Sequence, residues 1–168
     1  VERVEAGMLL YEKKYKNFHI TLLGETGINN PQAIPAEKLN RLCEPSYVAY
    51  LGKTDDVRSY IKNADAVVLP SFYREGTPKS LLEALGIGRP IITTKMPGCK
   101  ETVIEGENGF LCEPQSAKDL ADKMEQFIHL DFKKRQAMGE RSRKLAEEKY
   151  NEIIVIDSYL EAIKNVLD

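Results

Sequence analysis

The sequence has no tryptophan, two histidines and three cysteines among its 168 residues. The cysteines, Cys43, Cys99 and Cys112, are odd in number and widely spaced, so they form neither a CxxC pair nor a disulfide framework. Neither His19 nor His129 has another metal-ligating residue nearby, and a zinc-type His/Cys cluster is missing. We therefore expect reduced thiols, a cytoplasmic protein and no bound metal ion.

The sequence also lacks long apolar runs and a charge imbalance. No run approaches the roughly 18 apolar residues of a membrane span, and the opening VERVEAG lacks the hydrophobic segment of a signal peptide. Lys and Arg number 24 and Asp and Glu 26, and a net charge of −2 gives no overall attraction to nucleic acid. A length of 168 residues with 42% hydrophobic content fits one domain, residues 1–168.

Short apolar runs alternate with helical patterns along most of the chain. The runs predicted as strands are 18–23, 47–51, 66–69, 90–94 and 110–112. The predicted helices are 2–16, 36–43, 55–63 with Asp55 as its cap, 79–87 closed by Gly88, and, in the carboxyl-terminal segment 116–168, residues 116–129, 131–149 and 152–167. This alternation predicts an α/β fold with a Rossmann-like parallel sheet flanked by helices.

The loops after the predicted strands are candidate ligand sites, because open parallel sheets bind ligands at the carboxyl ends of their strands. Of these loops, the one before helix 79–87 has the most groups that can bind a charged ligand. Thr77 can cap this helix, and Pro78 fits its first position, where a missing N–H costs nothing. The amides of Lys79 and Ser80 then point out of the helix start, and Gly76 lets a ligand approach the backbone. These features predict a seat for phosphate.

Two carboxylates bracket this seat. Glu83, in the second turn of the helix, can accept two hydrogen bonds from a vicinal diol such as that of ribose. Glu75, just before the seat, can accept from the hydroxyls of a second ring. The spacing fits a sugar–diphosphate–nucleoside. It fits equally well an ordinary helix in which Glu83 pairs with Lys79 or Arg89 and Glu75 is a solvated loop charge.

The segment REGTPKSLLEALGIGRPIITT resembles the E-x7-E signature of retaining glycosyltransferases of family 4, which have the GT-B fold. The resemblance continues through PGCKETVIEGENGFLCEP downstream and through FHITLLGE and YVAYLGKTDDVRSYIKNADAVVLPS upstream. It covers nearly the whole chain. Several ordered motifs agree, which is more specific than the two glutamates alone.

The resemblance implies a role for each matching residue in a carboxyl-terminal, nucleotide-sugar-binding domain. Glu83 matches the glutamate that holds the donor ribose, and Glu75 matches the catalytic position beside the anomeric centre of the transferred sugar. The backbone of 76–80 matches the stretch over the diphosphate and sugar. Gly24 matches a glycine turn beside the donor, and Leu51 a position whose backbone faces the nucleobase. The family's commonest use predicts a UDP-linked donor with no metal.

The chain departs from the family pattern at its start. The family's carboxyl-terminal domain opens with a strand and a Gly-Arg…Lys loop, and neither is present here. The family's amino-terminal acceptor domain is also missing, so we expect an inactive fragment of a larger enzyme. The missing strand is central in the family's strand order. The sheet should therefore have a gap with an unprotected edge, which predicts pairing with another copy or local rearrangement.

The favoured interpretation is transfer of a sugar, with retention, from a nucleotide diphosphate to an acceptor hydroxyl in surface polysaccharide or glycan synthesis. The acceptor would be a glycan or lipid-linked saccharide, with the full-length enzyme peripheral at the inner face of the membrane. Two alternatives stay open: a non-catalytic interaction module on the same scaffold, and a GT-B-type nucleotide-sugar epimerase.

Overall fold

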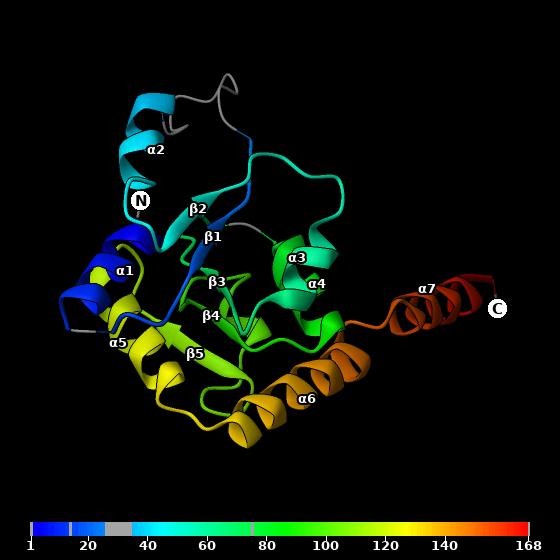
Figure 1. Ribbon diagram of the computed structural model, residues 1–168. Coiled ribbons are helices and arrows are strands. Elements are labelled where there is room, and N and C mark those ends of the chain that lie inside the picture. Colours follow the sequence, from blue (N-terminus) through cyan, green and yellow to red (C-terminus); the bar gives the residue numbers. More distant parts are fainter. Residues whose placement is uncertain (1, 14, 26–34, 75, 168) are drawn as a thin grey trace.

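The computed structural model describes residues 2–13, 15–25, 35–74 and 76–167, in which five strands alternate with seven α-helices (Figure 1). The strands are β1 (Ile20–Leu22), β2 (Val48–Tyr50), β3 (Val67–Leu69), β4 (Ile91–Thr94) and β5 (Gly109–Cys112). The helices are α1 (Glu2–Glu12), α2 (Ala36–Leu42), α3 (Val57–Asn63), α4 (Lys79–Ile87), α5 (Ala117–Ile128), α6 (Phe132–Lys149) and α7 (Glu152–Leu167), with the 3-10 turn η1 (Lys100–Thr102) before β5. The predicted α/β class is confirmed.

The strands are parallel but form two separate sheets, β1–β2 and β3–β4–β5. Within the described residues no strand joins the two, so the predicted break in the sheet is present. The backbone N–H and C=O of Val67 point toward β4. Those of the next residue, Val68, therefore point the opposite way, toward the open edge of β3. There the side chain of Arg3 in α1 donates to the Val68 carbonyl at 2.9 Å. An arginine therefore satisfies one edge group that a neighbouring strand would otherwise take.

The three-stranded sheet is buried on both faces, which explains why its strands read as continuous apolar runs. Every residue of β4 is buried. Ile92 packs with Phe110 and Leu120 in one core cluster, on the side of α1 and α5. Its neighbour Ile91 packs with Leu85 in another, on the side of α4. Successive side chains of one strand therefore supply two different cores.

Helices α4 and α6 cross at a pair of glycines. A Cβ on Gly139 would overlap the carbonyl oxygen of Gly88, so both positions need glycine for this approach. Gly88 also has φ +76°, the left-handed conformation that ends α4 where the sequence predicts. The close crossing fixes α6 against the carboxyl end of α4.

An exposed polar network joins the end of α1 to α5, which lie side by side (Figure 1). The Lys13 ammonium lies 2.6 Å from a Glu125 oxygen and 3.1 Å from an Asp122 oxygen. The Tyr15 hydroxyl donates to Glu125 at 2.8 Å and lies 2.7 Å from Nε2 of His129. The Lys13 hydrogen bond is the main cause that lowers the pKa of Glu125 and of Asp122, and the bond to Glu125 raises the pKa of Lys13.

This network predicts a stability difference that depends on pH. The two carboxyl groups have a lower pKa folded than unfolded, so their contribution is present above about pH 4 and is lost as pH falls through the folded pKa. We expect Lys13→Met to lower the thermal midpoint at pH 6.5 and to have a smaller effect at pH 2.5, because the carboxyl groups take up protons as the pH falls through their folded pKa. Calorimetry of both proteins at both pH values measures this. An equal difference at the two pH values would contradict it.

Some helix predictions need correction. The first helix ends at Glu12 rather than 16, and α3 begins at Val57 rather than 55. Asp56, not Asp55, is at its cap position, and its side chain makes no cap bond. Its backbone N–H bonds to the Thr54 hydroxyl in a local turn. The bounds of α7 agree with the sequence, but its large apolar side chains are exposed and the helix points away from the sheets (Figure 1). None of the described helices is long and apolar enough to cross a membrane.

Candidate functional site

The first turn of α4 faces solvent at the end of the loop after β3. The helix is oriented by Leu81 and Leu85, which are fully buried. Its first backbone bonds run from Leu81 and Leu82 to the Pro78 carbonyl, at 3.0 and 3.2 Å. The N–H groups before these belong to Lys79 and Ser80, at the open end of the helix. The helix start therefore presents two amides and the positive end of its dipole.

The cap of α4 differs from the prediction. Pro78, not Thr77, occupies the cap position, with an extended backbone (φ −60°, ψ 131°), and no described side chain makes a cap bond there. A proline carbonyl can accept the first helical bond while its ring keeps φ near the helical value, so the helix starts one residue later than a threonine cap would place it. The phosphate seat keeps its amides, and Thr77 is half-buried beside it.

Glu83 lies one turn along the same helix from Lys79. The ammonium of Lys79 is 3.7 Å from a carboxylate oxygen of Glu83, and their side chains are 90% and 24% exposed. A pair with so exposed a lysine contributes little and is easily displaced. Arg89 does not pair with Glu83 among the described contacts, because its guanidinium donates to the Lys62 carbonyl. The Glu83 carboxylate is accessible and can accept hydrogen bonds from a ligand.

The loop between β3 and α4 is anchored by hydrogen bonds where the chain leaves β3. The buried Thr93 hydroxyl donates to the Leu69 carbonyl at 2.6 Å, and the buried Thr94 hydroxyl donates to the Ser71 carbonyl. Gly76, farther along, is exposed. Glu75, the predicted catalytic residue, lies outside the described residues, so its role stays a prediction.

A second group of site residues lies at the carboxyl ends of β1 and β2. The N–H of Gly24 bonds to the Gly52 carbonyl at 3.0 Å, and the N–H of Leu51 bonds to the Leu22 carbonyl at 3.0 Å. The structure thus brings the predicted residues Gly24 and Leu51 into adjacent turns. The Tyr50 hydroxyl donates to the Gly24 carbonyl at 2.7 Å and holds the two turns together, a contact that the sequence analysis missed. The glycine after a strand signals the turn at 52, where φ is +74°.

The PGCKET segment follows β4 at the same edge of its sheet. The Glu101 carboxylate accepts from the N–H of Gly98 at 2.7 Å, and Cys99 is buried. These residues therefore shape the turn themselves.

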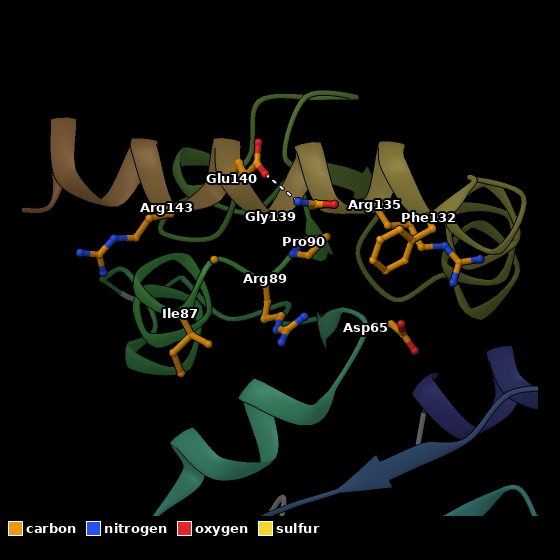
Figure 2. A pocket seen from close by; sticks show the side chains of 11 residues that line it. Asp65, Ile87, Arg89, Pro90, Phe132, Arg135, Gly139, Glu140 and Arg143 are labelled. Carbon is orange, nitrogen blue, oxygen red and sulfur yellow. Dashed lines mark hydrogen bonds between the residues drawn. The ribbon is translucent and has the colours of Figure 1, made fainter.

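A hollow of about 600 Å³ lies elsewhere, between α6 and the segment before β4 (Figure 2). Asp65 and Pro90, which line it, precede β3 and β4, so it lies at the amino ends of these strands. Figure 2 shows Arg135 and Arg143 at its two ends, directed away from each other. The hollow therefore does not belong to the donor loops. Among the described residues no cluster of three His, Cys, Asp or Glu side chains is placed to hold a metal ion.

Comparison with known proteins agrees with this geometry. Residues 4–145 match the family described as glycosyl transferases group 1. An N,N'-diacetylbacillosaminyl-diphospho-undecaprenol alpha-1,3-N-acetylgalactosaminyltransferase from Campylobacter jejuni is 34% identical over 82% of this chain, which spans 36% of that relative's length. The carboxyl-terminal domain of a group 1 glycosyl transferase (LpcC) from Francisella tularensis is 27% identical, with a TM-score of 0.72 over 89% of this chain and 78% of that one.

The fold also matches longer chains. A structure of HepE from Anabaena in complex with UDP has a TM-score of 0.82 at 20% identity, covering 98% of this chain and 44% of that one. At that identity the likeness shows the fold alone. The family match covers most of the chain and includes the loops described above. The chain thus belongs to the glycosyl transferases group 1 family and has the fold of the carboxyl-terminal half of a GT-B glycosyltransferase.

Proposed function

We propose that residues 1–168 are the donor-binding domain of a retaining glycosyltransferase that uses a UDP-linked sugar. The observation that carries the proposal is the start of α4, where the open amides of Lys79 and Ser80 lie one turn from the accessible carboxylate of Glu83. An anion seat and a diol acceptor on one short helix match the diphosphate and the ribose of a nucleotide sugar. The UDP bound to the Anabaena protein of the same fold supports the choice of nucleotide.

Each group at the site has a stated task in this proposal. The backbone N–H groups within 76–80, Pro78 excepted, bind the diphosphate, and the helix dipole stabilises the negative charge that develops as the diphosphate leaves. Glu83 accepts from the ribose hydroxyls, and the turns at Gly24 and Leu51 lie beside the base. Glu75 positions the transferred sugar. The reaction then replaces the bond from the anomeric carbon to the diphosphate oxygen by one to the acceptor oxygen on the same face, and the proton of the acceptor hydroxyl passes to the departing diphosphate. The proposal includes no metal ion or other cofactor.

The acceptor side of the reaction requires more chain than these residues. The relative from Campylobacter jejuni acts, by its name, on a diphospho-undecaprenol-linked saccharide, and this chain spans 36% of it. We propose a glycan or lipid-linked acceptor, bound mainly by an amino-terminal domain, at the cytoplasmic face of a membrane. The 168-residue chain alone should not turn over, and repeated sugar transfer by it would contradict this.

The test is ligand-observed NMR of the chain with UDP, GDP, ADP and NAD at equal concentrations. We expect UDP to bind residues 1–168 selectively and weakly, with a Kd of roughly 1 mM, about 4 kcal/mol. Silence from every nucleotide, both with this chain and with a longer protein that contains it, would contradict the proposal and favour a non-catalytic interaction module. Epimerised UDP-sugar formed by the longer protein without an acceptor would favour an epimerase.

The open edge of β3 and the exposed face of α7 predict self-association. At the β3 edge Arg3 already takes the Val68 carbonyl, so the larger contribution should come from α7, where Ile156, Leu160 and Ile163 offer apolar surface. We expect light scattering at about 100 µM to give a mass above that of the monomer. Leu160→Asp tests whether α7 contributes, with Ser158→Asp as a control on the same helix. A single stable monomer at every concentration would contradict the prediction.

A further inference from the structure

Two aromatic side chains are exposed together on the loop that leads to α4. Phe72 and Tyr73 are 39% and 46% exposed. Their ring centroids are 4.2 Å apart with an interplanar angle of 31°. Neighbouring side chains of an extended strand point in opposite directions, so this stacking requires the bend that the chain makes here. Large aromatic rings are usually buried, and such a pair in solvent presents apolar surface to a ligand.

Phe72 and Tyr73 are exposed although the backbone just before them is held in place. Ser71, the residue before the pair, donates its N–H to the Leu69 carbonyl at 3.0 Å and accepts from the hydroxyl of Thr94. Thr94 is completely buried in the central strand of its sheet. The backbone that carries the rings is therefore fixed next to the core. A platform held in this way loses little conformational entropy when a ligand binds.

The order of residues along the loop indicates which part of the substrates the Phe72–Tyr73 pair contacts. In the proposed function, Glu83 takes the ribose and the amides at Lys79 and Ser80 take the diphosphate, so the donor runs from its nucleoside toward its sugar as the chain is followed back toward Gly76. Phe72 and Tyr73 come still earlier in the same loop, before position 75, which the family resemblance assigns to the transferred sugar. What lies beyond the transferred sugar in a transfer reaction is the acceptor.

We propose that the Phe72–Tyr73 pair is the platform on which a pyranose ring of the acceptor stacks. One face of a pyranose carries C–H groups and is apolar, and it buries well against an aromatic ring. The Tyr73 hydroxyl adds a donor and acceptor for a sugar hydroxyl. This inference rests on the proposed function for its account of which sugar is bound. The proposed function and this inference can fail separately, because the first concerns binding of the nucleotide and the second binding of a saccharide.

The experiment is saturation-transfer NMR of the 168-residue chain with saturating UDP. The probes are methyl α-D-glucopyranoside and its 2-acetamido analogue, with sorbitol as a polyol that has no ring. We expect saturation of the ring C–H protons of the glycosides and little of sorbitol. The signal should fall at least threefold in Phe72→Ala and Tyr73→Ala, stay largely unchanged in Tyr73→Phe, and be unaffected in Tyr159→Ala, which removes an exposed tyrosine from α7. The UDP signals should stay the same in all variants.

Three results would overturn the proposal. One is no saturation of the glycosides above that of sorbitol. Another is glycoside signals unchanged in both alanine variants, or reduced equally by Tyr159→Ala. The last is a loss of UDP signal in step with Phe72→Ala and Tyr73→Ala, which would assign the rings to the nucleotide. Circular dichroism of each variant verifies that it is folded. If UDP binds neither the unaltered chain nor a longer protein that contains it, the proposed function fails, while the glycoside signals still test the platform.

Discussion

Glu83→Ala is expected to weaken UDP binding by about 30- to 150-fold. The carboxylate accepts from two ribose hydroxyls in the proposed site, and hydrogen bonds to a charged group contribute about 2–3 kcal/mol together once water is displaced. Among the described residues Glu83 forms an ion pair with the exposed Lys79 alone, so loss of its carboxylate should leave the fold unchanged. Isothermal titration of a longer protein that contains this domain measures the affinity directly. In the 168-residue chain, the millimolar complex should disappear from the NMR spectrum.

Two controls separate recognition from general charge. Glu83→Gln keeps the shape and one acceptor oxygen, so its affinity should lie between those of Glu83→Ala and the unaltered chain. Glu161→Ala removes an exposed carboxylate from α7, with the same change in net charge, and should bind UDP normally. If Glu83→Ala binds UDP as tightly as Glu161→Ala does, ribose recognition by this helix is excluded.

Gly109→Ala is expected to destabilise the fold by about 3 kcal/mol or more. A Cβ at Gly109 would overlap the carbonyl oxygen of Ile91 and lie 2.8 Å from its carbonyl carbon. The obstacle is the backbone of a completely buried strand, which cannot move aside as a side chain could. Urea unfolding followed by circular dichroism measures the change, and a variant that is insoluble on expression counts as the same outcome.

The matched control is another glycine-to-alanine change. Gly86 lies within α4 and an added Cβ meets no atom within 4 Å. Alanine is favoured over glycine in a helix by up to about 1 kcal/mol, so Gly86→Ala should unfold at equal or higher urea. A Gly109→Ala midpoint equal to that of the unaltered protein would show that β5 does not approach β4 as described.

The sequence was sufficient where local chemistry decides the structure. The apolar run at 90–94 gave a buried strand, and Gly88 ended α4 because the left-handed conformation there favours glycine. Strand order came from the family resemblance, which predicted the break between the two sheets. The cap at Thr77 was predicted wrongly, since the choice between adjacent residues at a helix start depends on how the incoming loop is held.

Contacts between distant residues could not be predicted. The Lys13–Glu125 pair depends on the docking of α1 against α5, and neither residue has a signal in its own segment. The bond from Arg3 to Val68 exists only because the β3 edge is open. The apolar periodicity of 152–167 predicted a helix correctly, but it cannot tell whether anything covers the apolar face, and here it is exposed.

The central claim is that a UDP-sugar binds at the start of α4, and backbone amide shifts measured during a UDP titration test it most directly. The account predicts that the largest shifts occur at Gly76, Lys79 and Ser80, with a second group at Gly24 and Leu51. It predicts no shift at Gly88 or at 139, which border the hollow at the opposite edge of the sheet. Shifts concentrated around that hollow, or none at the α4 start while UDP is bound, would contradict the account.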